Sequence, residues 1–234
     1  MANAQHVAGT WNIDPTHTTL SFTARHAMVT KVRGQFNEFE GSITIDGENP
    51  NNSSVEVTVH ANSIDTNNDM RDGHLRSNDF FDIDTYPTLS FKSTTVEASE
   101  EEIVVTGDMT IKGVTKEITI TLDWTGPVTD PYGVDRLGFE TSFSINRQDY
   151  GVSFSAPLEA GGVLVGDKVN IELDIAAVKA AQLLGARVRE FPRSGRVSRN
   201  QAAFLAIRLR FSQHWLGQRI FSEPRVLRGR AECT

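Results

Sequence analysis

Apolar and polar residues alternate with a period of two along most of the first 180 residues. The clearest case is the segment TLSFTA, where Leu20, Phe22 and Ala24 alternate with hydroxyl-bearing residues. Successive side chains of a strand point to opposite faces, so this period indicates a strand with one buried face. The pattern predicts a domain built mainly of β-strands.

Eight segments share this strand-like pattern: 18–26, 32–45, 54–60, 88–96, 102–111, 117–124, 138–145 and 168–175. Within 32–45, Gly34 and Gly41 predict bends or bulges. Lys112–Gly113 and Gly126–Pro127 are among the pairs that predict turns. At least eight strands with hardly any helix favour an all-β sandwich or a closed barrel, and closure removes exposed edges. The interior of such a barrel is filled by side chains or holds one small ligand, and periodicity leaves both open.

Residues 68–86 (NDMRDGHLRSNDFFDIDTY) break the alternation and predict an irregular loop or a short helical turn inserted between strands. Function often lies in loops of such mixed chemistry. Histidine and carboxylates within 72–82 could bind a divalent metal. The six histidines show no ligand-like spacing, so we favour a loop pinned by Asp–Arg and Asp–His hydrogen bonds and expect no metal.

Charge divides the chain in two. Residues 1–180 hold 12 Lys and Arg against 27 Asp and Glu, whereas residues 181–234 hold 11 Arg, no Lys and three Glu. We therefore expect a flexible leader over 1–8, a folded domain over 9–179 and an Arg-rich extension over 180–234. The acidic domain argues against nucleic-acid binding, which needs clustered positive charge.

The extension is expected to be disordered or partly helical. Its segment 202–221 mixes apolar and Arg positions and could form a basic helix at an anionic membrane surface, which would make the protein membrane-peripheral. A disordered tail, a product of an altered reading frame and a segment that folds back on the acidic domain are the alternatives.

Neither a membrane span nor a catalytic motif is visible. No apolar run approaches the ~18–20 residues of a spanning helix, and the start MANAQHVAGTWNID lacks a secretory signal, which favours the cytoplasm. The single cysteine, Cys233, forms no disulfide within the chain. There is no G-x-S-x-G elbow, and in the Gly-rich segment 161–168 Asp167 stands where a phosphate loop needs Lys. We expect no enzyme.

Aromatic residues without hydroxyls dominate the apolar positions, with thirteen Phe and three Trp against three Tyr. Composition alone favours an ordinary aromatic core. The alternative is an elongated apolar cavity with polar groups at its mouth.

Five motifs occur in a fixed order: WNIDPTH at 11–17, RDGHLRSNDFFD at 71–82, GDMTIKGVTK at 107–116, NRQDYGV at 146–152 and VGDKV at 165–169. This set closely resembles the YceI-like family of polyisoprenoid-binding proteins, over residues 9–179. The resemblance implies an extended, eight-stranded antiparallel lipocalin-like barrel with an internal apolar channel. It also implies binding, sequestration or transport of a polyprenyl chain, a polyprenyl diphosphate or an isoprenoid quinone, with no other cofactor.

The resemblance implies ligand contacts at Leu20, Phe22, His26, Phe36, His74, Leu75, Arg76, Phe80 and Phe81. The strand pattern adds Phe91, Trp124, Phe143 and Phe154. Arg76 or Arg147 could meet a diphosphate or quinone head, but we favour structural bonds to Asp79 and Asp149. Many family members carry a secretory signal that this sequence does not show. A filled barrel acting as a stress-response interaction module, an isoprenoid-modifying enzyme and a homodimer remain alternatives.

Overall fold

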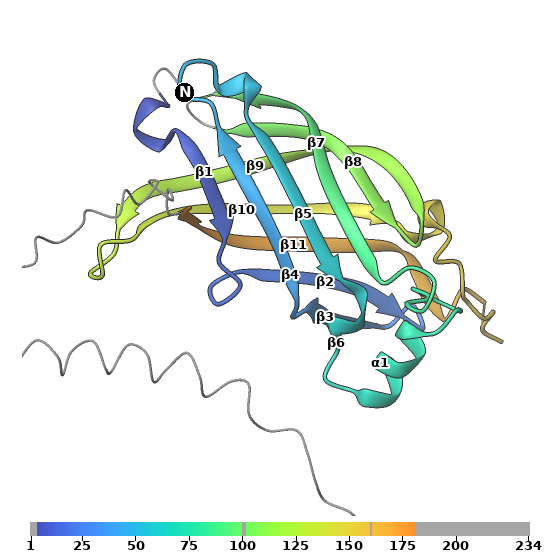
Figure 1. The fold of residues 1–234 in the computed structure, drawn as a ribbon. Coiled ribbons are helices and arrows are strands. Elements are labelled where there is room, and N and C mark those ends of the chain that lie inside the picture. Colours follow the sequence, from blue (N-terminus) through green and yellow to red (C-terminus); the bar gives the residue numbers. More distant parts are fainter. Residues whose placement is uncertain (1–3, 100–101, 160, 181–234) are drawn as a thin grey trace, which may run out of the picture. The chain divides into compact units, whose positions relative to one another are not determined.

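The computed structural model describes residues 4–99, 102–159 and 161–180, and most of these residues lie in strands (Figure 1). The strands are β1 (Gly9–Ile13), β2 (Thr19–His26), β3 (Thr30–Phe36), β4 (Phe39–Ile45), β5 (Ser54–His60), β6 (Ile64–Asp65), β7 (Thr88–Ala98), β8 (Ile103–Ile111), β9 (Val114–Thr129), β10 (Asp135–Asn146) and β11 (Val165–Lys179). The helical elements are α1 (Asp69–Arg76) and the 3-10 turns η1 (Gln5–Val7), η2 (Pro50–Asn52), η3 (Ala61–Ser63) and η4 (Arg147–Tyr150).

Eight antiparallel strands close a barrel in the order β1-β4-β5-β7-β8-β9-β10-β11. Trp11 of β1 completes the ring, because it lies opposite Ile43 of β4 on one side and Lys179 of β11 on the other. The predicted eight-stranded barrel is therefore confirmed. Closure leaves no free strand edge in this ring, whereas an open sheet would expose two edges.

Strand β11 is long enough to pair with two strands in succession. Its first part, from Val165 to Asp174, pairs with β2, and its last residues pair with β1. β3 then pairs with β2, and the short β6 pairs with the end of β3. The β2–β3 hairpin thus continues the barrel wall beyond the point where β1 ends and β4 begins.

The predicted segment 32–45 is two strands, separated at Asn37–Glu38. Neither glycine in it forms the predicted bulge, because β3 pairs with β2 and β4 with β5 without a shift of register. Their role is close approach: a Cβ atom on Gly34 would lie 2.5 Å from the Phe22 ring. A glycine in a strand marks either feature, and only the packing decides between them.

The turn predicted at Gly126–Pro127 is wrong, since both residues lie inside β9. Proline cannot donate a ladder hydrogen bond, so the sequence pattern alone argues against a strand that continues through it. Here the register between β9 and β10 shifts between Arg136 and Gly138, opposite this dipeptide. The irregularity accommodates the proline and lets β9 continue to Thr129.

The inserted segment begins with the short helix α1, which corresponds to the expected helical turn. Asn68 caps its N-terminus by accepting a hydrogen bond from the Arg71 amide at 2.9 Å. The buried carboxylate of Asp72 accepts from the Thr66 amide at 3.0 Å and from the Thr66 hydroxyl. These bonds fix the helix against the end of β6. No helix in the described residues is long and apolar enough to cross a bilayer.

Part of the segment expected to be a flexible leader belongs to the core. Ala4 and Val7 are fully buried, and the Trp11 indole N–H donates to the Val7 carbonyl at 2.8 Å. The sequence signal was weak because three residues of 3-10 turn have no periodicity. Residues 1–3 and the Arg-rich segment 181–234, with the helix and membrane contact predicted there, lie outside the described residues.

Candidate functional site: an apolar cavity inside the barrel

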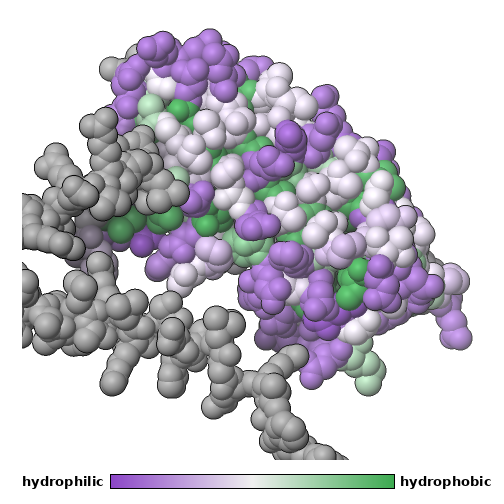
Figure 2. All heavy atoms as spheres, viewed as in Figure 1, coloured by the Kyte–Doolittle hydropathy of each residue, from purple (hydrophilic) through white to green (hydrophobic). Residues whose placement is uncertain are grey.

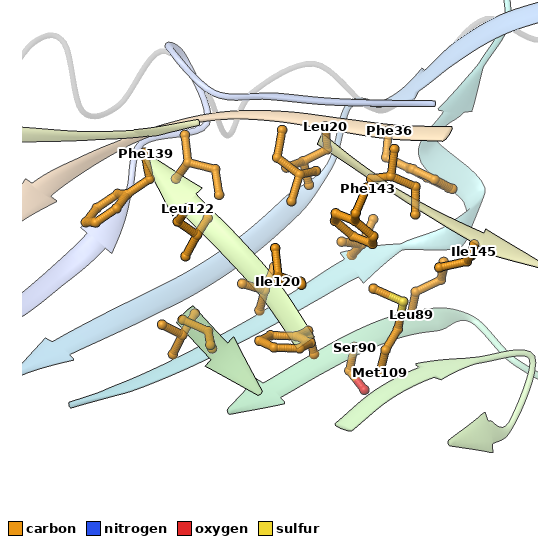
Figure 3. Close-up of a pocket in the computed structure, with 18 of the residues that line it drawn as sticks. Leu20, Phe36, Leu89, Ser90, Met109, Ile120, Leu122, Phe139, Phe143 and Ile145 are labelled. Atoms are coloured by element: carbon orange, nitrogen blue, oxygen red, sulfur yellow. The ribbon is translucent and has the colours of Figure 1, made fainter. Parts of the chain in front are cut away.

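The inward side chains of the barrel enclose a cavity of about 300 Å³. It runs from Val7 and Pro50, at the end of the barrel near the N-terminus, to Leu75 of α1 and Phe81. Figure 3 shows side chains from several strands pointing into this one space, with Phe143 of β10 facing the opposite wall. The volume is at the lower end of the roughly 300–1,000 Å³ found for ligand pockets.

Strand alternation makes the cavity wall apolar. On β9, Ile120, Leu122 and Trp124 line the cavity, whereas the intervening Thr121 and Asp123 are exposed. The same parity continues on the neighbouring strands, because paired residues of antiparallel strands share a face. Each strand therefore contributes apolar side chains to the interior and polar side chains to solvent.

Few polar side chains reach the lining, and they are Ser21, Ser53, Ser90, Arg147 and Tyr150. The Tyr150 hydroxyl is buried without a hydrogen-bond partner among the described residues. Burial, with a smaller contribution from Asp149, raises the pKa of Tyr150. The hydroxyl therefore remains protonated at neutral pH and keeps an unused donor near the α1 end.

Arg147 is a structural clamp. Its guanidinium, 5% exposed, donates to the carbonyls of Val152 at 2.6 Å, Phe154 at 2.9 Å and Gly166 at 3.0 Å, and pairs with Asp167 at 3.1 Å. Burial lowers the pKa of Arg147, and the nearby carboxylate of Asp167 opposes that shift. The predicted bond between Arg147 and Asp149 is wrong, because η4 places the Arg147 side chain at the start of β11, where Asp167 lies.

Aromatic rings cover the cavity at the α1 end. His74 packs edge-on against Phe80, with ring centroids 5.0 Å apart, and against Phe154 at 4.8 Å. The Phe80 and Phe154 rings are 5.1 Å apart, which completes a three-ring cluster. The exposed side of the His74 imidazole bonds to the Asp79 carboxylate at 2.9 Å. We call these three rings the aromatic cluster.

The structure brings ten of the fourteen expected ligand contacts together in the cavity lining: Leu20, Phe22, Phe36, Leu75, Phe80, Phe81, Phe91, Trp124, Phe143 and Arg147. His74 and Phe154 lie behind Phe80 in the aromatic cluster. His26 is exposed at the end of β2.

Arg76 lies away from the lining and donates to the carbonyls of Asn62 at 2.9 Å and Ile64 at 2.7 Å. It is structural, as we favoured, but its expected partner Asp79 bonds His74 instead. No group of three or more His, Cys, Asp or Glu within the described ranges is arranged to hold a metal.

Sequence reasoning missed the non-aromatic part of the wall and one inward aromatic, Phe139. The non-aromatic part includes Ile13, Ile43, Val55, Val57, Val59, Leu89, Met109, Ile111, Ile120, Leu122, Leu137, Ile145, Ile171, Leu173 and Ile175. The signal that could have found them is parity. A residue two positions from an inward aromatic shares its face, as Leu122 does with Trp124. Adding only aromatic residues from the strand pattern discarded that information.

The comparison with protein families decides where this barrel belongs. The model of the YceI-like domain matches residues 11–177. The chain belongs to the YceI-like family. Relatives of this YceI-like chain include a UPF0312 protein of Pseudomonas paraeruginosa, 40% identical over 150 residues, which are 63% of this chain and 78% of that protein. A UPF0312 protein of Staphylococcus epidermidis is 39% identical over 165 residues, 69% of this chain and 93% of that protein.

Solved structures share the YceI-like fold. BcnA of Burkholderia cenocepacia is 22% identical with a TM-score of 0.61, covering 70% of this chain and 98% of that one. The YCEI protein of Campylobacter jejuni is 26% identical with a TM-score of 0.57, covering 67% and 90%. A polyisoprenoid binding domain from Saccharophagus degradans, described as implicated in plant cell wall breakdown, is 17% identical with a TM-score of 0.57, covering 73% and 98%.

Proposed function

We propose that the barrel binds one isoprenoid-type lipid chain in its central cavity and carries or sequesters it without chemical change. The observation that carries this proposal is the cavity wall, which is apolar from Val7 to Phe81. Each isoprene unit moved there from water gains ~25 cal/mol per Å² of apolar surface. The likeness to a polyisoprenoid binding domain supports the same ligand class.

The polar end of the lipid belongs at the α1 end in this proposal. Arg147 is saturated by carbonyls and Asp167, so it leaves no charge for a diphosphate. Tyr150 retains a neutral donor there. A quinone or alcohol oxygen, which accepts one hydrogen bond, matches that group better than a multiply charged head does.

The test is native mass spectrometry of the full chain, followed by organic extraction and identification of the lipid. One isoprenoid per chain supports the proposal. A folded protein that is empty, and stays empty when offered polyprenyl alcohols and isoprenoid quinones, contradicts it and favours the interaction module. Conversion of the offered lipid would favour the isoprenoid-modifying enzyme.

A matched pair of substitutions on β9 separates the cavity from the fold. Leu122→Trp places a larger ring inside the cavity, whereas Thr121→Trp places the same ring on the exposed face. The first should abolish lipid retention and the second should leave it unchanged. Equal retention in both folded variants would place the lipid elsewhere.

Tyr150→Phe tests where the head lies. Removing a buried hydroxyl without a partner should leave the empty protein as stable as before or more stable. Affinity for a quinone should fall about tenfold, the effect of one lost hydrogen bond of ~1.4 kcal/mol. Affinity for a matching hydrocarbon without the oxygen should stay unchanged, and an equal fall for both would contradict the assignment.

A further inference from the structure

The β2–β3 hairpin presents two adjacent apolar side chains to solvent at its tip. Met28 is 54% exposed and Val29 is 76% exposed. The face of the barrel visible in Figure 2 is mostly hydrophilic or intermediate in character, with scattered hydrophobic patches. Among the described residues, the other large apolar side chains that are more than half exposed are Met70 of α1 and Val128 and Tyr132 of the β9–β10 hairpin.

The backbone of this turn disfavours the residues that it carries. The Val29 amide donates to the His26 carbonyl at 3.1 Å, which closes a β-turn over residues 26–29 within the three-residue loop between β2 and β3. Ala27 and Met28 both have positive φ, 50° and 60°. Asn and Gly are the residues that such a turn favours. A chain selected for this turn alone would not place methionine at its second position.

Positive charge flanks the apolar tip. Arg25, Lys31 and Arg33 are exposed, and no ion pair in the described part of the chain includes them. Arg25 lies directly opposite Lys31, an arrangement that is repulsive until an anion binds. Residues 15–37 contain no Asp or Glu, although the folded domain is strongly acidic.

The surroundings of the hairpin change sign with distance from the tip. Beside it, Lys168 is exposed and Asp167 is paired with Arg147, while Glu159 is an exposed carboxylate of the adjacent loop. Farther along the wall, carboxylates gather in a shallow groove: Asp123, Glu140, Glu172 and Asp174. An anionic surface is attracted to the tip and repelled by the wall.

We propose that this hairpin docks the protein on an anionic phospholipid bilayer. Met28 and Val29 enter the interface between headgroups and acyl chains, and Arg25, Lys31 and Arg33 contact lipid phosphates. The orientation is tip first, because the wall is acidic. Docking needs no lipid in the cavity, so it goes beyond the proposed function.

Docking would also bring the cavity close to the membrane. Phe22 and Ala24 of β2 line the cavity, six and four residues before Met28 at the tip. The same strand therefore joins the membrane-facing turn to the lipid-binding wall. In Figure 1 the end of β2 lies at the same end of the barrel as α1, where the aromatic cluster is found.

The test is flotation of the full chain with phosphatidylcholine vesicles, with and without phosphatidylglycerol. We expect binding only when phosphatidylglycerol is present, and a loss of binding with added salt. Lys31→Glu should weaken binding ~30-fold, because each surface charge contributes ~1 kcal/mol and a reversal changes two charges. Residues 181–234 are present in every variant, so their contribution is constant.

Lys31→Glu also excludes misfolding as the explanation. It replaces a like-charge pair with an attractive one opposite Arg25, so the thermal midpoint should stay the same or rise. Met28→Asp is a second variant, since aspartate tolerates positive φ, and it should reduce binding at least tenfold, whereas Val128→Asp on the β9–β10 hairpin should not. Vesicle binding by all three variants that equals the binding of the unchanged chain would overturn the proposal. An absence of vesicle binding would also overturn it and favour an acidic protein partner.

Discussion

Two hairpins at opposite ends of the barrel expose apolar residues, and their turns are built differently. In β9–β10 the Asp130 carboxylate accepts from the amides of Tyr132 at 2.9 Å and Val134 at 3.0 Å, and Gly133 takes the positive φ. In β2–β3 the positive φ angles fall on Ala27 and Met28. One turn has the residues its backbone requires, and the other does not.

Charge separates the two hairpins further. Tyr132, 91% exposed, lies among Asp130, Asp135 and the salt-bridged Arg136. Met28 instead lies near cations that form no ion pair within the part of the chain that the structure describes. The 15 residues of β11 span the distance between these ends, about 45 Å at ~3.3 Å per residue. Exposed apolar area alone therefore says little about binding. The charge around it decides what it can approach.

The substitution with the largest expected effect on the unfolding free energy lies at the end of the barrel that carries the β9–β10 hairpin. Trp11→Ala removes a fully buried ring that bonds Val7 and lies under Lys179, with the ammonium 5.4 Å from its centroid. It should cost ~3–5 kcal/mol of unfolding free energy and lower the thermal midpoint by ~10 °C. Urea unfolding measures it, with Trp11→Phe as the milder control. A loss below ~1 kcal/mol would mean that Trp11 does not hold this end.

Arg147→Met tests the end that carries β2–β3. Three of the carbonyls that it leaves without a donor belong to Val152, Phe154 and Gly166, and the loss should be ~3 kcal/mol. Amide hydrogen exchange should accelerate first around the β2–β3 hairpin. Arg136→Met, at the more exposed arginine of the opposite end, should cost less. A larger loss for Arg136→Met would reverse the comparison.

Asp14→Asn tests the ionic link beside β9–β10. Hydrogen bonds from His17 and Arg136, both 2.8 Å from Asp14 Oδ2, hold the pKa of Asp14 well below its ordinary 3.8. A carboxyl whose pKa is lowered on folding stabilises the protein above its unfolded pKa, and this contribution is lost as pH falls through the folded value. The variant should lose ~1 kcal/mol at neutral pH.

Below the ordinary pKa of Asp14 the difference between wild type and Asp14→Asn should shrink, which urea unfolding across an acid series would measure. A difference that stays constant to the lowest pH would show that the carboxylate charge contributes nothing.

The smallest expected effect is on the two turns themselves. Met28→Gly relieves positive φ and should stabilise by ~0.5 kcal/mol, yet weaken vesicle binding. Gly133→Ala imposes positive φ on alanine, with no atom near the new Cβ, and should destabilise by ~1 kcal/mol without changing vesicle binding. Thermal melts measure the stability of both variants, and flotation measures their vesicle binding. A Met28→Gly variant that melts earlier would contradict the account of the turn.

Local pattern was sufficient for much of the fold. β5 has the predicted bounds, and the alternation on β9 and β10 places Trp124 and Phe143 on the inner face. It failed where a single residue type has two structural uses. Gly34 marks close approach to Phe22 and not a bulge, and Pro127 sits within a strand at a register shift.

The sequence predicted many of the aromatic residues of the candidate site, but it did not predict which groups bond its polar side chains. Leu20, Phe22 and Phe36 lie where motif and parity placed them. Arg147 pairs with Asp167 across twenty residues instead of the neighbouring Asp149, because η4 and the start of β11 meet only in the folded chain. Sequence separation carries no information about such a contact.

The sequence by itself determined the strand content, the inner and outer faces and the resemblance to the YceI-like family, because these depend on local periodicity and on short motifs. Only the tertiary structure decided that β11 pairs with β1 to close the barrel, that a cavity remains inside it, and that the cations of β2–β3 form no ion pair with any carboxylate of the described residues. Those outcomes depend on how distant strands pack, which no single segment contains.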